Sequence, residues 1–218
     1  VAVYVKGTVL AMQKIEAPFG QATALVPLAI RTLADVGVQF SSLSHVAAGC
    51  GPGSFTGLRV SLAAAKGVCL AHDIIGLGIS GLEALAFSLS GTLNGLPVLC
   101  ISDTRRGNVY AQLFASDMTP QSTIFEAQID QLPLLVSKSI CGDGLMLAGF
   151  GGLAAKMAFA ANGLAATPVP FGVNQDAKTV DAGMIATMAA KKIMLGDFPP
   201  LTPLYLADPH LGPKKSSS

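Results

Sequence analysis

The chain has 218 residues, of which 51% are hydrophobic and only 12% charged, and its formal net charge is +1. An average soluble domain has about a quarter of its residues charged, so we expect a partner chain to cover part of the apolar surface. No basic patch that alone would hold nucleic acid is expected, because the paired basic residues lie far apart in the sequence: Arg105–Arg106, Lys191–Lys192 and Lys214–Lys215.

The longest uncharged stretches do not resemble a membrane-spanning helix. Ala84–Ser102 and Met157–Gln175 are interrupted by proline, glycine and polar residues, whereas a spanning helix needs about 20 consecutive apolar residues. No basic-then-apolar signal peptide opens the chain. The cysteines form no CxxC pair and lie among apolar residues, which is typical of buried free thiols in a reducing compartment: Cys50, Cys69, Cys100 and Cys141. We therefore expect a cytoplasmic protein.

The first part of the chain alternates between strand and helix patterns. Val1–Val5 and Thr8–Gln13 are short and rich in β-branched residues, and they predict a hairpin. Gln21–Val36 has apolar residues at helical spacing and predicts a helix that Gly37 ends. Because Pro27 lacks an N–H, this helix is expected either to start near it or to bend there.

The following segments continue the alternation. Ser44–Gly49 predicts a buried strand, Gly57–Ala71 a helix of small residues, and Ile74–Ile79 another short strand. Ser80-Gly81-Leu82-Glu83 has the pattern of a capping box and should open a helix. Pro97–Ser102 then predicts a further buried strand.

The second part of the chain repeats this order in outline. Asn108–Phe114 is expected to pair back on the preceding strand as a hairpin, Ala115–Gly144 has no clear pattern, and Phe150–Ala161 and Thr179–Leu195 predict helices. Alternating strands and helices favour an α/β fold, and the hairpins indicate mixed sheets. We expect an N-terminal lobe of residues 1–96 and a C-terminal lobe of residues 97–218.

A glycine-rich turn, Gly51–Gly57, joins a predicted strand to a predicted helix. A helix N-terminus offers free N–H groups to an anion, so the candidate contacts to an anion or nucleotide here are Gly51, Gly53, Ser54, Thr56 and Arg59. The spacing GxGxxxG matches neither the P-loop nor the dinucleotide fingerprint. The alternative is a tight structural turn with Ser54 or Thr56 as helix cap, and the residues alone favour it.

A second polar group, Asp103, Arg105 and Arg106, follows a predicted buried strand. Ligands of α/β folds often bind at the carboxyl ends of strands, so the two arginines could hold a nucleotide or tRNA phosphate. The other interpretation is a solvated hairpin corner with a local Asp–Arg pair, which contributes little to stability. The sequence slightly favours the second interpretation.

Two neighbouring predicted helices have wide apolar or small-residue faces. Such faces allow another helix to approach closely, and the candidate interface residues are Leu25, Leu28, Ala29, Leu33, Gly57, Ser61, Ala64 and Ala65. Both faces could instead be buried within one monomer, because a helix that is apolar nearly all round is usually buried. The residues alone leave these two interpretations equal.

The sequence predicts no catalytic residue, metal site or cofactor. His45, His72 and His210 are far apart and show neither HxxxH nor HExxH spacing, so they are interpreted as structural histidines. Ser54 does not lie in a GxSxG motif, and no histidine is obviously placed to act as its base.

Four motifs resemble the signature of the TsaB (YeaZ) family. They are GPGSFTGLRVSLAAAKGVCLA from Gly51, Ser80–Ala86, Asp103–Tyr110 and Pro203–Leu206, in the order found in the family. The resemblance extends from about Val1 to Pro213. It implies an actin-like or sugar-kinase-like ATPase fold of two lobes, each with a mixed sheet and flanking helices, in which the nucleotide site is degenerate.

The resemblance also implies a function and partners. Members are non-catalytic scaffold or activator subunits of the complex that forms N6-threonylcarbamoyladenosine in tRNA. They associate with a TsaD-type catalytic subunit, with a TsaE-type ATPase and with themselves as homodimers. They bind tRNA only as part of the complex. The helices that correspond to Gln21–Val36 and Gly57–Ala71 are expected to form the dimer and TsaD contacts.

The chain departs from the family at its beginning. Members usually start with a strand ending in Asp-Thr before the segment that begins here at Val1, so a site that depends on that Asp is not assigned. The functional alternatives are a stand-alone ATPase or peptidase that uses the Gly51–Gly57 turn, and a plain nucleotide-binding module.

Overall fold

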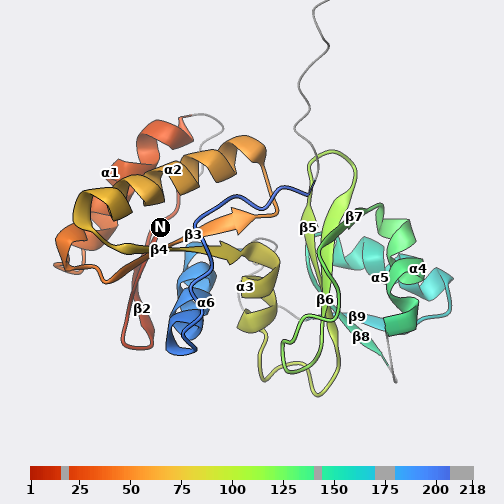
Figure 1. Ribbon diagram of the computed structural model, residues 1–218. Coiled ribbons are helices and arrows are strands. Elements are labelled where there is room, and N and C mark those ends of the chain that lie inside the picture. Colours follow the sequence, from red (N-terminus) through yellow and green to blue (C-terminus); the bar gives the residue numbers. More distant parts are fainter. Residues whose placement is uncertain (16–19, 140–143, 170–179, 207–218) are drawn as a thin grey trace, which may run out of the picture.

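A computed structural model describes residues 1–15, 20–139, 144–169 and 180–206 of the chain. Within them the strands form three sheets, of which one is antiparallel, one parallel and one mixed (Figure 1). Helices cover the sheets on both sides. The α/β fold with mixed sheets that the sequence predicts is therefore confirmed.

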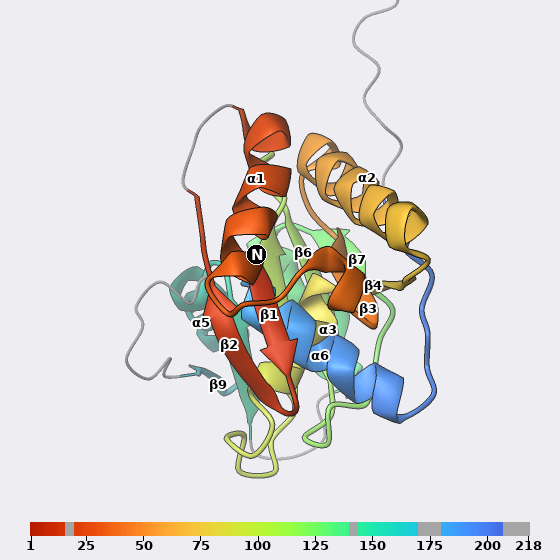
Figure 2. The same ribbon diagram turned by 90° about the vertical axis from the view of Figure 1, so that its left-hand side faces the viewer.

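The N-terminal elements form two small sheets beneath a pair of helices (Figure 2). Strands β1 and β2 form the predicted antiparallel hairpin, β3 and β4 pair in parallel, and α1 packs beside α2. The bounds are β1 Ala2–Val5, β2 Thr8–Met12, α1 Gln21–Ala34, the 3-10 turn η1 Phe40–Ser42, β3 His45–Gly51, α2 Phe55–His72 and β4 Ile75–Ser80.

Helix α1 runs without interruption through Pro27. It begins at Gln21, six residues before the proline, so of the two alternatives a start near Pro27 is wrong, and a bend at Pro27 stays a prediction. Asp35 caps its C-terminus, and Gly37 adopts a φ of 67° that a residue without a side chain reaches readily. The predicted glycine stop is thereby confirmed.

The C-terminal elements build a five-stranded sheet of order β7-β6-β5-β8-β9. β5 and β6 form the predicted antiparallel hairpin, while β8 and β9 pair in parallel on the other side of β5. The bounds are β5 Val98–Asp103, β6 Val109–Phe114, β7 Phe125–Ala127, the 3-10 turn η2 Ile129–Gln131, α4 Leu132–Val136, the 3-10 turn η3 Ser137–Ser139, β8 Leu145–Gly149, α5 Gly152–Ala161 and β9 Ala166–Pro168.

Helix α3 (Gly81–Ser88) lies between the parallel pair and the five-stranded sheet. Its N-cap is Ser80, whose Oγ accepts a hydrogen bond from the Glu83 N–H at 3.4 Å, as the capping motif predicts. Ala84 packs with the core of β4, whereas Leu82 and Leu85 pack with the core of the five-stranded sheet. One short apolar helix thus joins two hydrophobic cores.

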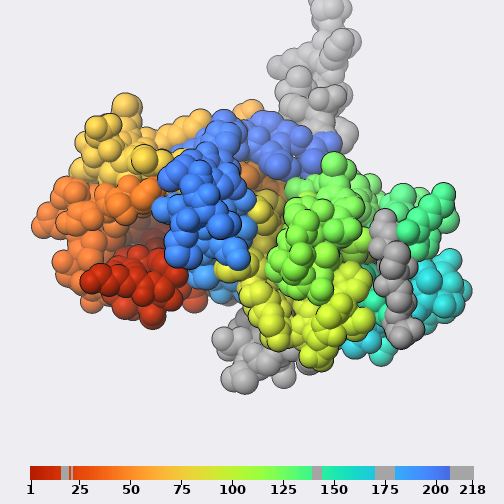
Figure 3. Space-filling view, turned by 60° about the horizontal axis from the view of Figure 1, so that its bottom comes forward, coloured from red at the N-terminus to blue at the C-terminus, as the bar shows by residue number. Residues whose placement is uncertain are grey.

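Helix α6 (Ala182–Met194) comes late in the chain but packs on the N-terminal strands β1 to β4 and on α3. Figure 3 shows it on the surface beside the β1–β2 hairpin. Two ion pairs lie along this helix: Lys192 Nζ is 2.8 Å from a Glu83 carboxylate oxygen of α3 and 2.9 Å from one of Asp197. Burial lowers the pKa of Lys192, but its hydrogen bonds and the charges of Glu83 and Asp197 outweigh that effect and raise it.

Candidate functional site

An extended segment, Pro199–Leu206, crosses the β3–β4 pair on the side that faces α2; we refer to it as the strap (Figure 1). The Gly78 N–H of β4 donates to the Pro199 carbonyl at 3.1 Å, and the Leu204 N–H donates to the Cys50 carbonyl of β3 at 2.8 Å. Leu201 is buried against Cys50 and α2. The strap therefore adds backbone hydrogen bonds and an apolar anchor to the end of β3 that leads into the glycine-rich turn.

Glycines make this close approach possible. A Cβ atom at Gly78 would lie 2.4 Å from the Pro200 carbonyl oxygen, and one at Gly51 would lie 3.1 Å from the Leu204 carbonyl oxygen. Gly51 also has a φ of 117°, which side chains disfavour. The alternation in β4 follows from this contact: Gly76 and Gly78 face the strap, while Leu77 and Ile79 are fully buried on the other side.

The side chain of Ser54 connects the glycine-rich turn to the first turn of α2. Ser54 is the N-cap of α2, and its Oγ accepts a hydrogen bond from the Gly57 N–H at 3.4 Å. Gly53 is half-buried, and Ser54 and Thr56 are exposed. Because the Ser54 hydroxyl caps the helix, its geometry favours the structural interpretation over a nucleophile.

Arg59 is held at the beginning of α2 by two aromatic side chains. Its guanidinium carbon lies 3.7 Å from the centre of the Phe55 ring, and its Nε donates to the Tyr205 hydroxyl at 3.1 Å. The Phe55 and Tyr205 rings are 5.4 Å apart. Tyr205 of the strap thus contacts the glycine-rich motif. It orients Arg59, the positively charged residue among the candidate anion contacts of this turn.

The second candidate group forms a hairpin corner between β5 and β6. Asp103 accepts a hydrogen bond from the Arg105 N–H at 2.7 Å, and Arg105 has a φ of 58°. Arg106 donates to the Tyr110 hydroxyl at 3.0 Å and lies 3.6 Å from a Glu126 carboxylate oxygen. No hydrogen bond or ion pair between described residues joins this corner to the Gly51–Gly57 turn.

The eight predicted interface residues on α1 and α2 differ in how deeply they are buried. Leu28, Leu33 and Ala65 are buried within the chain, whereas the others are half-buried: Leu25, Ala29, Gly57, Ser61 and Ala64. The exposed apolar positions on these helices are different residues, which the sequence reasoning missed. They include Val26 and Ile30 on α1 and Ala63 and Leu70 on α2, of which Leu70 is 89% exposed.

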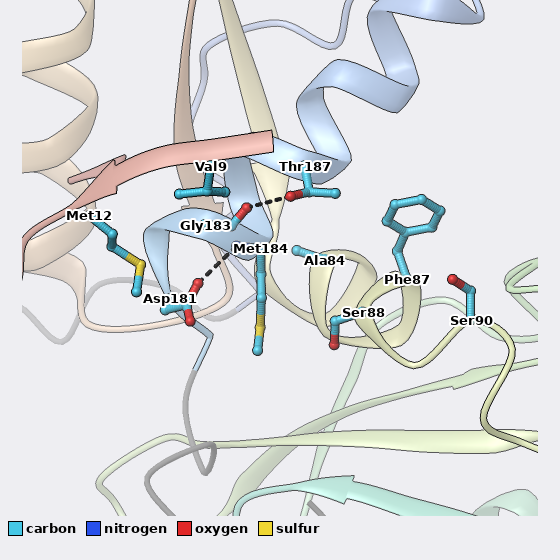
Figure 4. A pocket seen from close by; sticks show the side chains of 10 residues that line it. All are labelled: Val9, Met12, Ala84, Phe87, Ser88, Ser90, Asp181, Gly183, Met184 and Thr187. Atoms are coloured by element: carbon cyan, nitrogen blue, oxygen red, sulfur yellow. Dashed lines mark hydrogen bonds between the residues drawn. The ribbon is translucent and has the colours of Figure 1, made fainter. Parts of the chain in front are cut away.

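A groove of about 540 Å³ lies between β2, α3 and α6 (Figure 4). Its polar groups are largely engaged: Asp181 accepts from the Met184 N–H at 2.8 Å, Thr187 donates to the Gly183 carbonyl at 2.8 Å, and Ser88 donates to the Leu85 carbonyl at 2.7 Å. The other lining residues are Val9, Met12, Ala84, Phe87, Ser90, Gly183 and Met184. None of the predicted site residues lines this groove.

The described cysteines are partly or fully buried. Burial raises the pKa of the Cys50, Cys69 and Cys100 thiols, which disfavours the reactive thiolate. Cys141 and His210 lie outside the described residues. Within the described ranges no group of three His, Cys, Asp or Glu side chains could hold a metal ion, and no helix combines the length and hydropathy needed to cross a membrane.

Comparisons with known proteins point to one family. A family model described as "TsaD: tRNA N6-adenosine threonylcarbamoyltransferase" matches residues 21–137, which is just over half of the chain. The Escherichia coli protein named tRNA threonylcarbamoyladenosine biosynthesis protein TsaB is 31% identical over 110 residues, 50% of this chain and 47% of that protein. TsaB of Haemophilus influenzae is 33% identical over 86 residues, 39% of this chain and 36% of that protein.

Other relatives agree with this match. An uncharacterized protein of Mycobacterium tuberculosis is 36% identical over 89 residues, 41% of this chain and 40% of its own length. The matches thus span less than half the length of these curated relatives. A Pseudomonas aeruginosa crystal structure described as similar to peptidase YEAZ has a TM-score of 0.73 at 21% identity and covers 94% of this chain and 93% of its own. The structure named YeaZ from the same species has a TM-score of 0.69 at 19% identity, covering 94% and 92%.

The chain therefore belongs to this threonylcarbamoyltransferase-type family, in its TsaB (YeaZ) branch. The two structural likenesses show the fold alone, because the sequence identities are low.

Proposed function

We propose that the chain is a non-catalytic scaffold and activator subunit of the complex that forms N6-threonylcarbamoyladenosine in tRNA. It binds a TsaD-type catalytic subunit and pairs with a second copy of itself through the same helical surface. In this proposal residues 1–96 and 97–218 are the two lobes of an actin-like fold whose nucleotide site is degenerate. The names of the TsaB relatives support the pathway.

The outer surface of the α1–α2 pair is the observation that carries the proposal. Val26 and Ile30 are one helical turn apart on α1 and are 40% and 53% exposed. On α2, Ala63, Gly67 and Leu70 are exposed, so small residues lie beside a long apolar one. Large apolar side chains on adjacent helices are typical of a surface that another chain covers. The half-buried residues Leu25, Ala29, Gly57, Ser61 and Ala64 would line its base.

The engaged side chains of the two candidate polar groups support a non-catalytic role. The Ser54 hydroxyl caps α2, Arg59 is held by Phe55 and Tyr205, and Arg106 pairs with Tyr110 and Glu126. Each group therefore has a structural task within the chain. In the proposal the partner's residues perform the threonylcarbamoyl transfer, a TsaE-type ATPase joins the assembly, and tRNA binds only to the complex.

Reconstitution tests this function. Threonylcarbamoyl transfer to tRNA would be measured with the TsaD-type and TsaE-type proteins, alone and with the wild-type chain, the Ile30→Glu variant or the Met194→Glu variant. Met194 is 80% exposed on α6 and serves as the matched control. We expect transfer to depend on the wild-type chain, to be retained with Met194→Glu and to be lost with Ile30→Glu. ATP or peptide hydrolysis by the isolated chain, lost on Ser54→Ala, would instead support an enzyme.

A further inference from the structure

Helices α4 and α5 carry a second apolar surface, at the far end of the molecule from α1 and α2 (Figure 1). Leu134 and Leu135 of α4 are 79% and 54% exposed, and Leu153 and Met157 of α5 are 72% and 69% exposed. The two helices pack against each other. We refer to these four residues as the α4–α5 surface.

The composition of the two helices shows why this surface is unusual. The five residues of α4 are all apolar, and Lys156 is the only charged residue in α5. Their inner sides are already in the core, where Leu132, Val136, Ala155 and Phe159 are buried together. A helix that is apolar all round is normally covered on both sides. Among the described residues, only the inner side of each helix is covered.

Basic residues outnumber acidic ones beside the surface. Lys138 follows α4 in the η3 turn, Lys156 lies within α5, and both are exposed. Neither helix nor η3 contains an aspartate or glutamate, and no ion pair among described residues engages either lysine. Asp130 is exposed in the η2 turn, which precedes α4 and packs against both helices, so two lysines and one aspartate flank the surface. An occupant with acidic groups flanking an apolar stripe would complement this surface.

The arrangement also indicates the shape of the occupant. Leu153 and Met157 are four residues apart and lie in one row along α5, with α4 beside it. A row of this kind beside a second helix accepts the apolar face of a third helix. Membrane-surface helices are instead rich in Lys and Arg, whereas α4 and α5 have one lysine between them.

We infer that the α4–α5 surface is a docking site for an amphipathic helix of another protein, with leucine-type residues on one face and acidic residues beside them. The inference is independent of the proposed function, because it uses neither α1 nor α2. The α4–α5 surface would be a second binding surface, which remains accessible while a partner occupies the α1–α2 surface.

Two fluorescein-labelled synthetic peptides test the inference on the full chain. Each is an amphipathic helix of about five turns with a leucine stripe, flanked by glutamates in one peptide and by lysines in the other. Fluorescence anisotropy would be measured with wild type, Met157→Glu, the matched control Met194→Glu, and the double variant Lys138→Glu/Lys156→Glu. Thermal unfolding checks that each variant is folded. Sedimentation with phosphatidylserine vesicles distinguishes a membrane surface.

The glutamate peptide should bind wild type and Met194→Glu, and Met157→Glu should weaken it about tenfold or more, because burial of one large apolar side chain is lost. The double variant should reverse the preference between the two peptides. Equal binding of both peptides, or binding of neither, would overturn the inference. Vesicle binding that Met157→Glu abolishes, without peptide binding, would overturn it in favour of a membrane surface.

Discussion

The Nε of Arg59 donates a hydrogen bond of 3.1 Å to the hydroxyl of Tyr205, although 146 residues separate them in the chain. Arg59 belongs to the first and Tyr205 to the last of the four motifs that resemble the family signature. Phe55 packs against both side chains. The conformation of the Gly51–Gly57 turn thus depends on a segment from the other end of the described chain.

Removal of the Tyr205 ring should loosen this connection. Tyr205→Ala loses the contact with Phe55 and the hydrogen bond, and we expect about 1 kcal/mol lower free energy of unfolding in urea. Tyr205→Phe keeps the ring and should cost about 0.5 kcal/mol or less, since the site is partly exposed. Equal stability of Tyr205→Ala and wild type would show that the contacts of Tyr205 contribute nothing to the free energy of unfolding.

A methyl group at Gly78 should displace the strap. Its Cβ would lie 2.4 Å from the Pro200 carbonyl oxygen, which is a backbone atom that cannot rotate away. Gly78→Ala should therefore lower the free energy of unfolding by about 1–3 kcal/mol. Gly67→Ala in α2 is the matched control, because a Cβ there meets nothing within 4 Å and alanine favours helix. A thermal scan that ranks Gly78→Ala at or above Gly67→Ala would contradict the close contact.

The ion pairs of Lys192 should make a pH-dependent contribution to stability. Lys192→Met removes its links to Glu83 and Asp197, and we expect a loss of about 1 kcal/mol at neutral pH. The pKa of Lys192 is raised in the folded state, so its contribution is complete below the ordinary lysine pKa of about 10.4 and is lost as pH rises through the higher folded value.

Denaturation from neutral to strongly alkaline pH measures this effect. The stability difference between wild type and Lys192→Met should stay constant at neutral pH and vanish above the folded-state pKa. Lys191→Met, which loses a contact with the Phe87 ring, is the control. A difference that grows with rising pH would have the wrong sign for this account.

Local patterns predicted most of the elements, and long-range packing explains what they missed. The hairpins, the helix stop at Gly37 and the cap at Ser80 depend on neighbouring residues, and they were predicted correctly. Strand β8 (Leu145–Gly149) was missed because a short apolar run has no periodicity that separates strand from helix. The packing of α6 on β1 to β4 depends on contacts between distant segments, which a local pattern does not contain.

In the candidate site, too, local sequence predicts some features, whereas others depend on contacts between distant segments. The motif at Gly51–Gly57 and the cap Ser54 could be found from residue types and spacing, and the structure places Ser54 at the helix start. That Tyr205 holds Arg59 could not be found, because nothing in either local sequence indicates the other. For the helical surface, apolar spacing identified α1 and α2, but only the packed structure separates buried Leu28 from exposed Ile30.

Size-exclusion chromatography with light scattering tests whether the α1–α2 surface forms both the homodimer and the complex. Wild type, Ile30→Glu and Met194→Glu would each be measured alone and mixed with the TsaD-type subunit. We expect a wild-type dimer that exchanges into a mixed complex, the same behaviour for Met194→Glu, and a folded monomer that forms no complex for Ile30→Glu. A wild-type chain that stays monomeric at high concentration and never joins the TsaD-type subunit would contradict this expectation.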